Sequence, residues 1–71
     1  METVYTAIIE QDKETGLFVG YVPNIEGAHS QGETIEELRD NLKEVLELII
    51  EDGGLHETSV FVGIQNINLA A

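Results

Sequence analysis

The sequence has no cysteine, so neither a disulfide nor a thiolate metal site can stabilise its fold. It shows no basic segment leading into a short apolar run, as a secretory signal has, and no apolar run long enough to cross a bilayer. We therefore expect a cytoplasmic protein. Its 71 residues predict a single domain, residues 1–71. A domain of this size buries only about 60 % of the surface of its unfolded chain, which favours a homodimer or a higher oligomer.

Basic residues are scarce: three Lys and Arg stand against 14 Asp and Glu, and the formal net charge is -11 at pH 7. Nucleic-acid affinity rests on Lys and Arg displacing counterions, and anionic membranes attract basic segments. The charge therefore disfavours both as partners and suits a basic protein. Solubility alone explains an acidic composition equally well, so both interpretations stay open.

The first part of the chain has the pattern of short strands. β-Branched and aromatic residues predict strands over residues 3–10 and 17–22. The polar turn between them, in which Gly16 can adopt a positive φ, is short enough for an antiparallel hairpin. Pro23 ends the second strand because it cannot donate to a ladder, and a short third strand is expected over residues 28–31.

A helix follows, with Thr34 as N-cap and Glu37 completing a capping box. Gly53 and Gly54 are typical helix-ending residues. At ~100° per residue, six apolar residues form one stripe along the helix, which predicts packing on a sheet. The stripe comprises Ile35, Leu38, Leu42, Val45, Leu46 and Ile49.

A last strand is predicted after the helix. Val60, Val62 and Ile64 alternate onto one face and Phe61 onto the other, and residues 66–71 extend this strand or fray. The order becomes β-β-β-α-β. One helix on one face of a mainly antiparallel sheet is an α+β fold, a two-layer sandwich.

Six acidic residues share one side of the predicted helix, within about 100° of one another at ~100° per residue. They are Glu36, Glu37, Asp40, Glu44, Glu47 and Glu51. Like charges four residues apart cost roughly 0.2–0.5 kcal/mol per pair, and Glu51 lies where the helix dipole favours cations. Such a local conflict indicates either a partner-binding face or a solvated face that tolerates the repulsion. Leu48, off the apolar stripe, is either an ordinary exposed residue or an oligomer contact.

No arrangement of residues predicts catalysis. His29 has only Glu26 nearby to orient it, so a structural or partner-contacting role is favoured over that of a base, and His56 is given no role. Residues 12–16 resemble the start of a calcium loop but lack its further ligands. The acids of the helix are spread along its length, whereas two-metal hydrolysis requires them to converge. We expect no catalytic residue, metal or cofactor.

Three segments carry a resemblance. Residues 5–10 precede a polar turn that contains Gly16. Residues 16–27 read Gly-Leu-Phe-Val-Gly-Tyr-Val-Pro-Asn-Ile-Glu-Gly, and residues 30–38 read Ser-Gln-Gly-Glu-Thr-Ile-Glu-Glu-Leu. The spacing of the turn residues Pro23, Asn24 and Gly27, followed by this helix opening, resembles the HicB-like antitoxins of type II toxin–antitoxin pairs. Many members have Cys or a small residue where this chain has Ala28-His29.

The resemblance implies a truncated ribonuclease-H-like fold without its catalytic acids, in a protein that forms oligomers. The implied partner is a small basic HicA-type toxin that cleaves mRNA. Longer members carry a C-terminal DNA-binding segment, so this chain is expected to be a short form that binds no DNA by itself. The alternatives are an orphan oligomeric adaptor or small-ligand-binding module on the same fold and, more remotely, a metal-dependent hydrolase.

Overall fold

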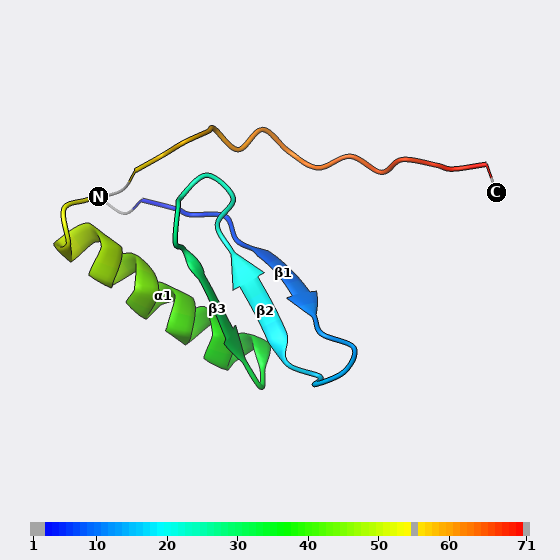
Figure 1. The fold of residues 1–71 in the computed structure, drawn as a ribbon, viewed down its shortest axis with the longest axis horizontal. Coiled ribbons are helices and arrows are strands. Elements are labelled where there is room, and N and C mark those ends of the chain that lie inside the picture. The colour runs from blue at the N-terminus through cyan, green and yellow to red at the C-terminus, as the bar shows by residue number, and fades with distance from the viewer. Residues whose placement is uncertain (1–2, 55, 71) are drawn as a thin grey trace.

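The structure, a computed structural model, describes residues 3–54 and 56–70. It contains a three-stranded antiparallel sheet in the order β1-β2-β3, with one helix on one of its faces (Figure 1). The elements are β1 (Ile8–Gln11), β2 (Phe18–Tyr21), β3 (His29–Gly32) and α1 (Ile35–Glu51). The chain is therefore a small α+β protein, and the prediction of three strands followed by one helix is confirmed.

The β1–β2 turn is built from its own polar side chains. Asp12 N–H donates to the Leu17 carbonyl at 2.9 Å, and Gly16 N–H donates to the Asp12 carbonyl at 2.8 Å. Gly16 has φ +75°, a conformation that L side chains rarely adopt. The predicted role of Gly16 is confirmed, and the hairpin register pairs Ile9 with Gly20.

The β2–β3 turn carries Pro23 and Asn24 and is anchored by Ile25, which is buried. Val22 N–H donates to the Ala28 carbonyl at 2.9 Å and closes the turn. Gly27 has φ +82°, so the turn residues shared with the resemblance shape the backbone here.

Both ends of α1 follow from local sequence. Thr34 Oγ1 accepts a hydrogen bond from Glu37 N–H at 3.0 Å, which confirms the predicted N-cap. At the other end Gly53 has φ +121°, and Gly54 N–H donates to the Ile49 carbonyl at 3.2 Å. This six-residue closure is the bond of a Schellman motif, so the predicted helix end is also confirmed.

The helix packs on β3 and β2, and two glycines let it come close. A methyl group on Gly32 would lie 2.6 Å from the backbone nitrogen of Leu38. One on Gly20 would lie 3.1 Å from the side chains of both Leu38 and Leu42. The buried hydrophobic residues of this small core are Val22, Ile25, Ala28, Leu38 and Leu42.

The prediction of a fourth strand is wrong for this chain. Within residues 56–70, hereafter the tail, the recorded pairing is a single bridge between Ile25 and Glu57, supported by Thr58 N–H donating to the Asn24 carbonyl at 3.3 Å. Ala71 lies outside the described residues. Alternating apolar residues make a segment able to form a strand, but a strand also needs the edge of a neighbouring strand for its hydrogen bonds. The Ile25–Glu57 bridge holds the tail at the β2–β3 turn and not at such an edge.

Candidate functional site

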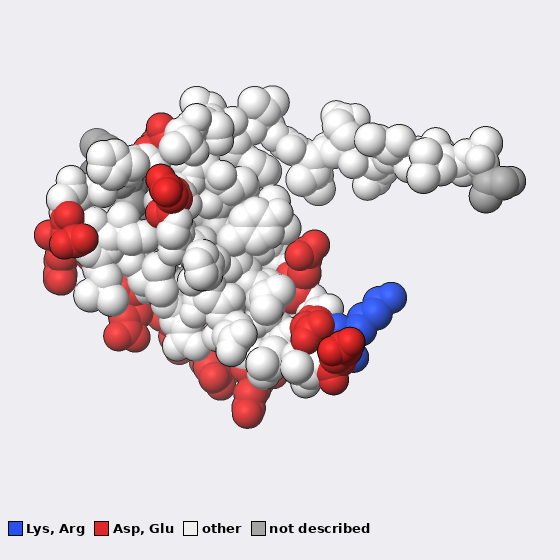
Figure 2. Space-filling view, in the orientation of Figure 1, with Lys and Arg blue, Asp and Glu red and all other residues white. Residues whose placement is uncertain are grey.

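The predicted acidic face exists as one exposed surface. All six of its residues (Glu36, Glu37, Asp40, Glu44, Glu47 and Glu51) are exposed along α1. Figure 2 shows red side chains along the lower left edge of the molecule, where α1 lies in Figure 1. The helix buries its opposite side, through Leu38 and Leu42, so these carboxylates point away from the core.

The electrostatics of this face work against the helix that carries it. The last turn of α1 holds no basic residue, whereas Glu51 lies there and Asp52 is the C-cap. Carboxylates at this end face the negative pole of the helix dipole. The structure thus retains the local conflict seen in the sequence, and a bound cation or basic side chain would relieve it.

Leu48 borders the acidic face and is 57 % exposed. It lines a shallow depression together with Val45, Ile49 and the acidic residues Glu51 and Asp52. A molecule that covers the C-terminal half of α1 would therefore meet an apolar contact beside the carboxylates.

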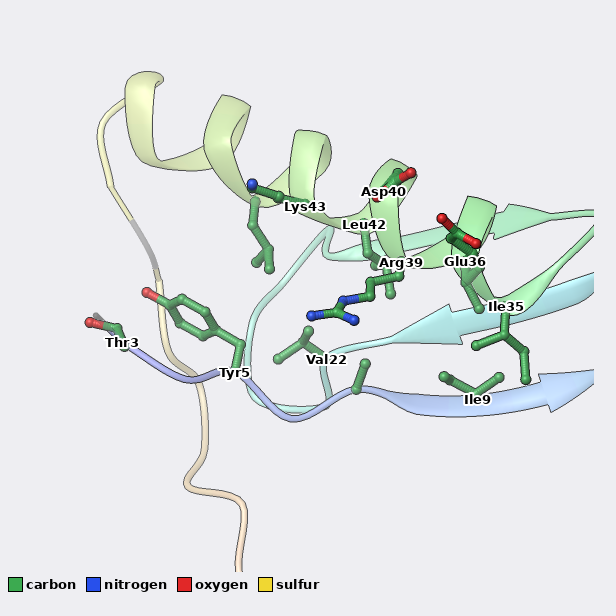
Figure 3. A pocket seen from close by; sticks show the side chains of 13 residues that line it. Thr3, Tyr5, Ile9, Val22, Ile35, Glu36, Arg39, Asp40, Leu42 and Lys43 are labelled. Atoms are coloured by element: carbon green, nitrogen blue, oxygen red, sulfur yellow. The ribbon is translucent and has the colours of Figure 1, made fainter. Parts of the chain in front are cut away.

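A second surface, which the sequence did not reveal, lies between α1 and the N-terminal strand region. In the described chain, α1 packs on β3 and β2 but not on β1, so the helix-facing side of β1 stays open. The result is a groove of about 790 Å³, hereafter the β1–α1 groove. Tyr5, Ala7 and Ile9 line it from the strand side, and Ile35 and Leu46 line it from the helix (Figure 3).

The β1–α1 groove also holds most of the scarce positive charge. Arg39 and Lys43, two of the three basic residues in the sequence, line it, and so do Glu36 and Asp40 of the acidic face. Figure 3 shows Arg39 reaching from α1 over the groove toward Val22. Ile35, predicted to belong to the buried stripe, is 53 % exposed because it faces this opening. The spacing of Arg39 and Lys43, one helical turn apart, was the sequence signal for a shared surface.

The other residues considered in the sequence do not gather into a site. Asp12 Oδ2 accepts hydrogen bonds from Thr15 Oγ1 at 2.7 Å and from Thr15 N–H at 3.3 Å, which accounts for this carboxylate without a cation. The Thr15 hydroxyl is the main cause that lowers the pKa of Asp12 from its ordinary value of 3.8. His29 and His56 are both exposed, His29 on β3 opposite Tyr21.

Within residues 3–54 and 56–70, no three His, Asp or Glu side chains are grouped so that they could hold a metal ion. In the same ranges, no helix has both the length and the apolar character needed to span a bilayer.

Comparison with known proteins places the chain in a family. A family model described as UPF0150-like matches residues 1–53, which run through β1 to the end of α1. The UPF0150 protein ssr1258 of Synechocystis is 46 % identical over 89 % of this chain and 90 % of its own length. A UPF0150 protein of Thermotoga maritima is 53 % identical over 72 % and 68 %, and one of Archaeoglobus fulgidus is 34 % identical over 92 % and 93 %. No solved structure is similar enough to count as a match. The chain therefore belongs to the UPF0150 family.

Proposed function

We propose that this chain is an antitoxin-like binding protein that occludes a small basic toxin of the HicA type. The observation that carries the proposal is the exposed acidic face of α1, a row of carboxylates that destabilises its own helix and suits a basic surface. The net charge of -11 supports the same partner through long-range attraction.

The resemblance in residues 5–10, 16–27 and 30–38 supplies the finer part of the proposal. According to this resemblance, β1 to α1 correspond to a truncated ribonuclease-H-like domain that catalyses nothing and acts in the cytoplasm. The acidic surface then acts by covering the RNA-binding surface of the toxin, which must be basic to hold a phosphate backbone. Nucleic acid and membranes are not partners of the chain by itself.

Co-expression tests the proposal directly. A basic reading frame beside this gene is expressed alone and together with this chain, and growth is measured. The neighbour is expected to stop growth alone and to lose that effect in the presence of this chain. A neighbour that still stops growth rules out the antitoxin function.

Charge reversal tests whether the acidic face makes the contact. Replacing Glu44, Glu47 and Glu51 by Lys is expected to weaken toxin binding strongly and to reduce the salt dependence of the dissociation constant. The control reverses three exposed acids outside α1, Glu10, Glu14 and Glu26, with the same change in net charge. Equal losses in both variants would show that only net charge matters, and unchanged binding would assign the contact to another surface.

A second candidate function is an orphan oligomeric adaptor or small-ligand-binding module. The β1–α1 groove favours it, because apolar walls with a few charged groups are typical of ligand sites. The absence of a basic neighbouring reading frame would favour this function over the first.

A further inference from the structure

The tail is the most apolar exposed part of the described molecule. Val60, Val62 and Ile64 are 79 %, 94 % and 77 % exposed, and they alternate as the inward face of a half-buried strand does. Ile67 and Leu69 continue the exposure at 80 % and 87 %. Contiguous exposed apolar surface of this kind marks an interaction site.

The β1–α1 groove offers what such a strand needs. The sheet order makes β1 an edge strand, so the backbone groups on its outer side have no ladder partner in the sheet. Tyr5, Ala7 and Ile9, at every second position, line the groove on the side of the chain that faces α1. An added strand would pair with β1 and place its apolar side chains against Ile9 and Ile35.

The tail of the same molecule does not fill this groove in the structure. The Ile25–Glu57 bridge holds its start at the β2–β3 turn. Figures 1 and 3 both show the chain leading away from α1 after that point. No residue of the tail is among those that line the groove, so the tail leaves the groove of its own chain open.

The distribution of charge favours a second copy of the chain as the molecule that supplies the added strand. Two copies of a chain with a net charge of -11 repel each other over most of their surface. Residues 58–70 contain no Asp or Glu, and Figure 2 shows this part of the tail without red side chains. The groove that receives it holds Arg39 and Lys43 together with Glu36 and Asp40, so its formal charges balance. The uncharged part of the tail of one copy can therefore approach this groove of another copy with less repulsion than two acidic surfaces would meet.

We propose that two copies of this chain exchange tails, each placing residues 60–64 beside β1 in the β1–α1 groove of the other. The two contacts are identical and related by a two-fold axis, so the dimer is closed and both grooves are filled. Glu36 and Asp40, at the start of the acidic face, border the groove, whereas Glu37, Glu44, Glu47 and Glu51 do not line it. Toxin binding is not needed for the dimer.

Point variants of the full chain test the exchange by mass and dissociation constant in analytical ultracentrifugation. Val62→Asp places a charge in the contact, and Ile9→Lys places one in the groove beside Arg39 and Lys43. Desolvation of an added charge among the apolar side chains of the contact is expected to weaken each of the two contacts at least about tenfold, so the dimer weakens roughly a hundredfold. The controls are Gln65→Asp, on the other face of the tail, and Thr6→Lys, on the other face of the strand region, and both are expected to keep the dimer.

Mixing the two disabled variants distinguishes exchange from any other contact. In a mixed dimer the intact tail of Ile9→Lys meets the intact groove of Val62→Asp, so dimers are expected to reappear in the mixture. A monomeric wild-type chain overturns the proposal, as does a dimer that both variants leave intact or a mixture that stays monomeric. Circular dichroism checks that each variant retains α1.

Salt separates this proposal from the antitoxin function. Screening reduces the repulsion between two acidic copies, so added salt is expected to strengthen the dimer while it weakens binding of a basic toxin. If the dimer forms but the chain has no affinity for the toxin, the antitoxin function is ruled out and the tail exchange still holds. Toxin binding by a chain that stays monomeric would remove only the exchange.

Discussion

Two segments of this chain have nearly the same sequence and opposite structures. Residues 18–21, Phe-Val-Gly-Tyr, form β2 in the centre of the sheet, and residues 61–64, Phe-Val-Gly-Ile, lie in the exposed tail. Gly20 packs against Leu38 and Leu42, whereas a methyl group on Gly63 would find no atom within 4 Å. The difference shows that this kind of tetrapeptide can form a strand, and that it does so only where other strands lie beside it.

The largest expected difference between the packed region and the tail concerns side-chain burial. Leu38 is 0 % exposed beneath β2, so Leu38→Ala is expected to lower the free energy of unfolding by about 2–5 kcal/mol. Val62→Ala, measured by urea denaturation at a concentration where the chain is monomeric, is expected to change it by less than about 0.5 kcal/mol. A similar loss for both would show that the tail packs within its own chain.

The next effect concerns the closest approach of α1 to the sheet. Gly32→Ala places a methyl group 2.6 Å from the Leu38 nitrogen, so the helix must shift, at a cost of about 1–3 kcal/mol. Thermal unfolding of this variant beside wild type measures the cost. An unchanged midpoint would mean that the helix has more freedom on β3 than the structure shows.

The glycines of the two matching tetrapeptides provide the sharpest comparison. Gly20→Ala brings a methyl group to 3.1 Å from two leucine side chains, and we expect a loss at the low end of the overpacking range, about 1 kcal/mol. Gly63→Ala meets open space, and its effect in the monomer is expected to be near zero. Denaturation of both variants at low concentration measures the two losses of stability. A larger loss for Gly63→Ala than for Gly20→Ala would contradict the finding that β2 is the packed one of the two tetrapeptides.

The end of α1, where the packed region meets the tail, is the place where a substitution is expected to raise stability and not to lower it. Glu51→Lys puts a cation in the last turn of α1 and removes its repulsion with Glu47, so stability is expected to rise by about 0.3–1 kcal/mol. Glu26→Lys, an equal charge change in an exposed turn, is the control for net charge. A gain of equal size in the control would assign the effect to the whole molecule and not to the helix end.

The smallest effect lies in the β1–β2 turn. The Thr15 hydroxyl lowers the pKa of Asp12, so the turn is stabilised above the ordinary carboxyl pKa of 3.8 and loses this contribution as the pH falls through the folded value. Thr15→Val is expected to raise the pKa of Asp12 in an NMR titration, while Thr15→Ser, which keeps the hydroxyl, is not. No change with valine would mean that the hydrogen bond does not persist in solution.

The sequence by itself determined the features that depend on neighbouring residues. Gly16 and Gly27 shape their turns, Thr34 begins α1 and Gly53 ends it, because caps and positive φ angles act within a few residues. The acidic face followed from helical periodicity alone. Its function remains a proposal, because periodicity shows where charges lie and not what they bind.

Only the tertiary structure decided what the apolar segments do. β1 begins at Ile8 and not at Thr3, Ile35 opens onto a groove, and the tail pairs with the β2–β3 turn through Glu57 and Thr58. Each outcome depends on which surface lies next to the segment, and that surface comes from residues distant in sequence. The two Phe-Val-Gly segments differ for this physical reason: β2 has strands on both sides and a helix above it, and the tail has none of these within its own chain.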